Sequence, residues 1–67
     1  MKINDIEKLT GLTQKAIRLY EAKGLISVDR SENGYRNYTE KDVETLKTIK
    51  LLRSSGISIP DIKLYLF

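Results

Sequence analysis

The residues of this chain best suited to chemistry are the cationic and polar side chains between positions 13 and 38. The run Thr13-Gln-Lys-Ala-Ile-Arg18 has the composition of a short basic helix, and Asn33-Gly-Tyr-Arg-Asn-Tyr38 is centred on a turn. Arginine and lysine bind phosphate oxygens, and arginine also bonds O6 and N7 of guanine. A duplex held in a groove by one element and at its backbone by another needs cations in two such places. The pattern therefore indicates DNA recognition.

The composition limits the chemistry open to the chain. Its 67 residues are enough for one domain with one small core. It contains no cysteine and no histidine, so a disulfide framework is excluded and zinc would have to rely on carboxylates alone. The carboxylate pairs Asp5/Glu7 and Asp42/Glu44 have i, i+2 spacing, which points them apart on a helix. We therefore expect that the protein is not an enzyme and that it binds no cofactor and no metal.

The distribution of charge says more than its total. The net charge of +3, from 12 basic and 9 acidic residues, is too modest to identify a nucleic-acid partner. Residues 13–38, however, carry five bases against three acids. No signal peptide or long apolar run is present, so a soluble cytoplasmic protein without membrane contact is expected. The bases of residues 13–38 are Lys15, Arg18, Lys23, Arg30 and Arg36.

The first two predicted helices form a helix-turn-helix over residues 4–23. Asn4 and Glu7 have the spacing of a capping box, so the first helix is expected to open at Asn4. Gly11 is expected to end it with a positive φ, and Thr13 is a good N-cap for the second helix. Two helices joined by a glycine-containing turn within about twenty residues are typical of this motif.

The second helix has two distinct sides. Its spacing places Ala16, Ile17 and Tyr20 toward a core. Lys15 and Arg18 then face elsewhere, so the basic side of the helix lies opposite the buried side. This helix is the predicted reading element.

A two-stranded β-hairpin, or wing, is predicted over residues 26–38. Short β-prone runs at 26–28 and 35–38 flank an Asn-Gly pair, a strong turn signal because both residues tolerate positive φ. Alternation along the second run places Arg36 and Tyr38 on one face.

A supporting helix pair is predicted over residues 40–67. Thr39 and Asp42 have capping-box spacing and open the third helix, and Ser58 opens the fourth with a proline in its first turn. A short glycine linker joins the two, so they are expected to pack as a hairpin. The predicted fold class is mainly α: a small winged helix-turn-helix of four helices with a two-stranded hairpin wing, in one domain over residues 1–67.

With these elements in place, the whole chain resembles the N-terminal DNA-binding domain of MerR-family transcription regulators. The run Ile-Arg-x-Tyr-Glu, followed at a set spacing by Asn-Gly-Tyr-Arg-x-Tyr, is much more specific than a helix-turn-helix alone. The match covers essentially all of the chain. Its residues are Ile3 through Ile6, Gly11-Leu-Thr13, Ile17-Arg18, Tyr20-Glu21, Gly24-Leu25, Asn33-Gly-Tyr-Arg36, Tyr38 and Gly56 through Ile62.

The resemblance implies a second helix in the major groove of double-stranded DNA and a wing on the flanking backbone. Family members are similar in acting as homodimers through a C-terminal helix that follows this domain. They distort promoters with an overlong spacer so that RNA polymerase aligns with both promoter elements. Neither that dimerisation helix nor an effector domain is present in these residues, so the chain looks like an isolated reading head.

Two positions depart from the family pattern. Many members carry two adjacent aromatics before the glutamate of the second helix, and here the first is Leu19. An aromatic contact with the DNA backbone is therefore not expected at that position. Glu7 stands where helix-turn-helix proteins usually have a small residue, so it is expected to splay outward or to serve only the N-terminal cap.

The candidate DNA-binding residues of the second helix are Thr13, Gln14, Lys15, Arg18 and Tyr20. The first three occupy its first turn, the part of a recognition helix that usually reaches base edges or phosphates. For Thr13, the N-cap role is sufficient by itself. Arg18 is placed to bond a phosphate or a guanine. Tyr20 is expected to bury its ring and offer its hydroxyl to a phosphate.

The candidate DNA-binding residues of the wing are Tyr35, Arg36 and Tyr38. Arg36 follows the turn of a protruding hairpin and has no obvious acidic neighbour, which favours a phosphate contact. Tyr38 shares a face with Arg36 and either supplements the phosphate contact or packs on the third helix. Tyr35 either packs within the hairpin or lies at the DNA surface. The cations most simply interpreted as solvated are Lys41, Lys47, Lys50, Arg53 and Lys63.

Two alternatives compete with the regulator hypothesis. An excisionase-like accessory factor that bends DNA has a similar small winged-helix design and can lack a sensor. A gene that continues into a long helix favours a regulator, and a stop near Phe67 favours the accessory role. The second alternative is a protein-interaction module using the apolar end at Tyr65-Leu-Phe67, which is better explained as the approach to a dimerisation helix.

Overall fold

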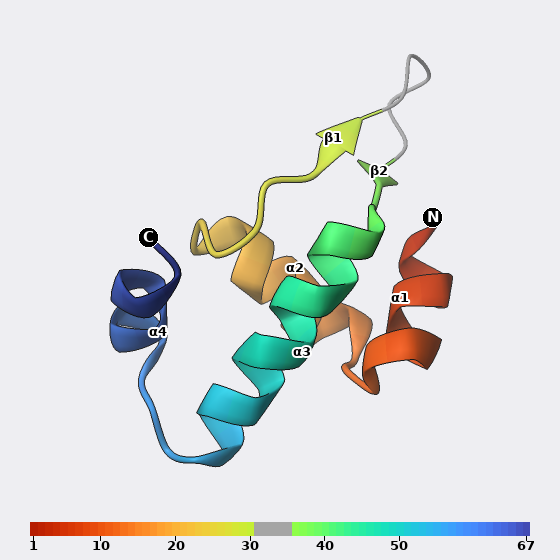
Figure 1. The fold of residues 1–67 in the computed structure, drawn as a ribbon. Helices are drawn as coiled ribbons and strands as arrows, with labels where there is room; N and C mark the ends of the chain where they lie inside the picture. The colour runs from red at the N-terminus through yellow and green to blue at the C-terminus, as the bar shows by residue number, and fades with distance from the viewer. Residues whose placement is uncertain (31–35) are drawn as a thin grey trace.

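The computed structural model describes residues 1–30 and 36–67, which form four helices and one short pair of antiparallel strands (Figure 1). The mainly helical fold with four helices agrees with the prediction. The helices are α1 (Ile3–Thr10), α2 (Gln14–Ala22), α3 (Glu40–Ser54) and α4 (Ile59–Leu66). The strands are β1 (Asp29–Arg30) and β2 (Arg36–Asn37).

Three of the four helices begin at the predicted caps. The Thr13 hydroxyl accepts from the amide of Ala16 at 3.1 Å and starts α2. In α3 the Thr39 hydroxyl accepts from the amide of Asp42 at 3.2 Å, while the Asp42 carboxylate accepts from the amide of Thr39 at 2.9 Å. Ser58 starts α4 in the same way. Each cap satisfies an amide that has no partner inside its own helix.

The predicted start of α1 is wrong. The helix begins at Ile3, and its cap is a bond from the Lys2 amide to the Asp5 carboxylate at 3.1 Å. Asn4 therefore lies inside the first turn. The expected partner of Asn4, Glu7, is engaged by α2 instead.

The α1–α2 turn is fixed from two directions. Gly11 has φ 74°, a left-handed conformation that glycine adopts without strain, and its amide bonds the Glu7 carbonyl at 2.8 Å. The Lys50 ammonium of α3 donates to the Thr10 carbonyl at 3.1 Å. This cation was predicted to be solvated. It instead satisfies the C-terminal end of α1, where a positive charge is favourable.

The strand pair is shorter than predicted and begins later. Asp29 pairs with Asn37 and Arg30 with Arg36, whereas residues 26–28 lie outside any strand. The predicted strand at 26–28 is wrong: these residues are not part of the strand pair, and Ile26, only 6% exposed, packs in the core. The predicted Asn-Gly turn lies outside the described residues. Two residues on each side do not establish the wing over 26–38, which stays a prediction.

The core lies where α3 crosses the other helices (Figure 1). Every helix contributes to it, together with the segment after α2 and the residue after β2. The N-terminus is bonded to the segment before α3, because the Tyr38 amide donates to the Met1 carbonyl at 2.9 Å. The buried apolar side chains are Ile6, Ile17, Tyr20, Leu25, Ile26, Tyr38, Val43, Leu46, Ile49 and Ile62.

Candidate nucleic-acid interface

Helix α2 presents a cationic side to solvent. Lys15 and Arg18 are exposed, whereas Ile17 is fully buried and Tyr20 is 7% exposed. Burial of the apolar side against the core fixes which way the basic side faces. Leu19 is 43% exposed on the same helix. The structure thus brings two of the predicted cations together on one accessible helix.

The first turn of α2 is bonded to α1 through Gln14. Its backbone amide donates to Glu7 Oε1 at 3.0 Å. Its side-chain amide donates to Asn4 Oδ1 at 2.7 Å and lies 3.4 Å from Glu7 Oε2. Gln14 is half-buried as a result. The residue predicted to reach DNA is therefore held on two sides by the preceding helix.

The predicted roles of Glu7 are both wrong. Its half-buried carboxylate neither splays outward nor caps α1, but accepts hydrogen bonds from Gln14 at the start of α2. A negative charge at a helix N-terminus is favourable because the unpaired amides there carry partial positive charge. Glu7 thus joins the two helices of the motif.

Arg18 lies one turn after Gln14 and is exposed. Its Nη2 is 3.5 Å from Gln14 Oε1, at the outer limit of a hydrogen bond. This contact orients the guanidinium weakly and leaves its remaining donors available. Five donors in a planar fork suit a phosphate or the edge of a guanine.

The two aromatic candidates described by the structure both lie in the core. Tyr20 is 7% exposed, which agrees with the predicted burial of its ring. Tyr38 is only 2% exposed, which agrees with the predicted alternative that it packs in the core. Its burial follows from its place directly before α3, where the chain returns from β2 to the core. Its contact with DNA stays a prediction.

The remaining candidates are Thr13, Arg36 and Tyr35. Thr13 acts as the N-cap of α2, and that role engages its hydroxyl. Arg36 lies in β2, paired through the backbone with Arg30. Tyr35 lies outside the described residues. Among these candidates, the exposed cations that the structure describes therefore lie on α2, whereas Arg36 is placed by the backbone of β2 alone.

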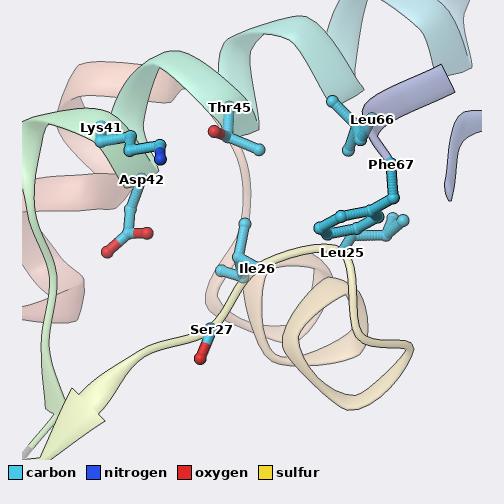
Figure 2. A pocket seen from close by; sticks show the side chains of 8 residues that line it. All are labelled: Leu25, Ile26, Ser27, Lys41, Asp42, Thr45, Leu66 and Phe67. Atoms are coloured by element: carbon cyan, nitrogen blue, oxygen red, sulfur yellow. The ribbon is translucent and has the colours of Figure 1, made fainter.

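A separate hollow of about 290 Å³ lies between the segment after α2, the start of α3 and the end of α4 (Figure 2). Its apolar side is formed by Leu25, Ile26, Leu66 and Phe67, and its polar side includes Asp42. Asp42 is already engaged as a helix cap, and the other polar side chains that line the hollow are Ser27, Lys41 and Thr45.

Over residues 1–30 and 36–67, no three histidines, cysteines or carboxylates are grouped so as to hold a metal ion. Nor is any helix within those ranges long and apolar enough to cross a membrane.

Sequence reasoning missed the bonding roles of Asn4, Glu7 and Lys50. The unusual glutamate at position 7 was a signal of a contact between the two helices, because Glu7 and Gln14 lie on opposite sides of the turn. For Lys50, 40 residues from the carbonyl it bonds, no local pattern exists. These roles depend on how α1 packs against α2 and α3.

The fold and the exposed basic helix define a helix-turn-helix domain. A family model described as MerR HTH family regulatory protein matches residues 1–66. The chain therefore belongs to the MerR HTH family.

Curated relatives carry the same domain at high identity. The HTH-type transcriptional regulator CueR of Vibrio cholerae is 52% identical over 64 residues, or 94% of this chain and 46% of that protein. CueR of Escherichia coli O6:H1 is 47% identical over 62 residues, 91% of this chain and 46% of that protein. Heavy metal-dependent transcription regulator 2 of Rhizobium meliloti is 42% identical over 64 residues, 94% and 44% respectively. The chain spans about half the length of these relatives.

Solved structures of MerR family members share the fold. A family regulator from Listeria monocytogenes has a TM-score of 0.91 and 30% identity, over 98% of this chain and 51% of its own. HiNmlR, a MerR family regulator lacking the sensor domain and solved bound to promoter DNA, gives the same values.

Proposed function

We propose that this chain is the DNA-reading domain of a MerR-type transcription regulator. The observation that carries the proposal is the exposed cationic side of α2 opposite its buried side. In this proposal α2 enters the major groove, and the segment around β2 contacts the flanking phosphate backbone. Such a division between groove and backbone contacts is usual for helix-turn-helix proteins with an additional arm or wing.

The residues have different roles in this proposal. Arg18 contacts a base edge or a phosphate, and Lys15 contributes a phosphate contact from the first turn. Arg36 contacts a phosphate from β2. Thr13 supports the interface by starting α2, and Tyr20 supports it by anchoring α2 to the core.

The regulator role is supported by the relatives. They are named as transcription regulators, and the solved HiNmlR is bound to promoter DNA. We infer that the full protein acts in the cytoplasm as a homodimer that distorts promoter DNA and thereby acts on RNA polymerase indirectly. The same names favour a regulator over an enzyme and over an excisionase-like accessory factor.

The proposed reading surface is tested by replacing one cation on it and one elsewhere. Arg18→Ala should weaken binding of the 67-residue chain to a half-site duplex by about tenfold, the worth of one good base or phosphate contact. The half-site is selected with this chain from a random duplex pool and compared with a scrambled duplex by fluorescence anisotropy. Lys47→Ala is the matched control because Lys47 is an exposed cation of α3.

The two substitutions remove the same charge, so net charge cannot explain a difference between them. Affinity within about twofold of wild type for Lys47→Ala, with the loss confined to Arg18→Ala, supports α2 as the reading helix. Equal losses would contradict that assignment.

A further inference from the structure

The bonds between α1 and α2 assign a role to Glu7. We propose that Glu7 limits the affinity of α2 for DNA of any sequence, because its carboxylate already accepts from the Gln14 amide and keeps a DNA phosphate from binding that amide. This inference rests on the proposed function, since it concerns how strongly the same α2 binds DNA. Glu7 itself contacts no base.

Two amides at the start of α2 are already paired within the protein. A helix N-terminus normally attracts phosphate because its first amides lack partners and carry partial positive charge. Here the Gln14 amide already donates to Glu7 Oε1 at 3.0 Å, and the Ala16 amide donates to the Thr13 hydroxyl at 3.1 Å. A phosphate at this position would meet a carboxylate of the same sign. The usual anion site is thus occupied by the protein itself.

The Gln14 side chain is bonded to α1. Its amide group donates to Asn4 Oδ1 at 2.7 Å, and Glu7 Oε2 lies 3.4 Å away. Its carbonyl oxygen faces Arg18 Nη2 at 3.5 Å. Bonding a base edge would require Gln14 to leave the α1 partners. Gln14 is therefore a positioning residue, in place of the base-reading residue expected from its sequence position.

This geometry lowers affinity without selecting a sequence. Phosphate contacts contribute to binding at every sequence, whereas base contacts contribute at the correct site alone. Excluding one phosphate from the start of α2 therefore weakens binding to the half-site and to other DNA by a similar factor, and Arg18 remains available to discriminate between them.

The test is Glu7→Gln, which retains an oxygen able to accept from the Gln14 amide but removes the charge. Glu44→Gln is the matched control, because Glu44 is an exposed glutamate of α3 and the net charge changes equally. Affinity for the selected half-site and for the scrambled duplex is measured by anisotropy from 50 to 200 mM salt. Amide hydrogen exchange of Gln14 in the free chain, in wild type and Glu7→Ala, checks the contact without DNA.

We expect Glu7→Gln to gain affinity for both duplexes by a similar factor. One added phosphate contact steepens the salt slope by about 0.9, so affinity for either duplex falls about threefold more over this salt range than in wild type. Glu44→Gln should leave the salt slope unchanged. Faster Gln14 exchange in Glu7→Ala supports the bond.

Different outcomes separate the inference from the proposed function. If wild type prefers the half-site and Glu7→Gln behaves like Glu44→Gln, the role of Glu7 is overturned while DNA reading stands. Unchanged Gln14 exchange in Glu7→Ala also overturns it. If wild type binds both duplexes equally, the sequence-specific function itself fails.

Discussion

Arg18 and Arg36 belong to different elements but are assigned the same kind of partner. Arg18 has a Gln14 oxygen at 3.5 Å and lies on a helix anchored by buried Ile17. Arg36 is positioned through strand pairing with Arg30. A helix in a groove meets base edges as well as phosphates, whereas an arm beside the groove meets mainly phosphates. Their substitution should therefore change binding in different ways.

Replacing Arg36 should weaken binding to every sequence by a similar factor. Arg36→Ala is expected to lose affinity for half-site and scrambled duplexes alike and to reduce the salt slope by about 1, because one phosphate contact is lost. Anisotropy titrations at three or more salt concentrations provide the slope. A loss confined to the half-site would instead assign base reading to this arginine.

The exposed side of α2 could be predicted from the sequence, whereas the burial of the tyrosines could be predicted only in part. The spacing of Ile17 and Tyr20 identifies the buried side of a helix, so Lys15 and Arg18 follow directly. Alternation along a short strand identifies two faces but does not say which one packs. For Tyr38 the answer depends on contact with distant helices, and the structure buries it at 2% exposure.

At the scale of elements, the helix starts show which local signals are reliable. Thr39 and Ser58 both have an aspartate three residues later, and each cap forms as predicted. The predicted start of α1 was wrong because two residue pairs, Asn4/Glu7 and Lys2/Asp5, compete to cap the helix. A tertiary contact decides between them, since Gln14 engages Glu7 and leaves Asp5 to accept from Lys2. Sequence spacing alone does not contain that information.

The α1–α2 turn offers a test with a matched control. Gly11→Ala and Gly56→Ala should each destabilise the fold by about 1–2 kcal/mol, because φ values of 74° and 85° are strained for alanine. A Cβ at Gly11 would also approach Lys50 Nζ to 2.6 Å, whereas one at Gly56 would meet nothing within 4 Å. Gly11→Ala should therefore cost about 1 kcal/mol more, through the displaced bond to Thr10.

Urea unfolding followed by circular dichroism measures both free energies. Repeating the pair in a Lys50→Met background should remove the difference between them. A difference that persists there would mean that the Lys50 bond does not stabilise the turn.

At the scale of the whole molecule, the chain spans about half the length of its curated relatives. One reading head offers one set of contacts, so affinity for a palindrome is limited unless two heads act together. Linking two binding modules raises affinity by about 10²–10⁴ when the linker spans both sites. Half-sites one helical turn apart are separated by about 34 Å.

A disulfide-linked pair of this chain should therefore bind a palindrome much more tightly than one half-site. A flexible Gly/Ser tail ending in cysteine is added after Phe67, where it leaves the bonds between Met1 and Tyr38 intact. The chain has no other cysteine, so oxidation gives a single product. About 20 residues in each tail give roughly the required span.

The reduced form of the same protein is the control for this gain. The linked form is expected to gain about 10²-fold or more on the palindrome and little on a single half-site. Equal affinity of the linked form for both duplexes would contradict a two-headed mode of binding.

An NMR titration can show directly whether α2 and the segment around β2 bind DNA, as we claim. The isotope-labelled chain is titrated with the selected half-site and with a scrambled duplex at two salt concentrations. We predict shifts concentrated at residues 13–20 and 34–38, larger with the half-site and reduced at higher salt. Shifts confined to α3 and α4, or no shifts at low salt, would contradict the claim.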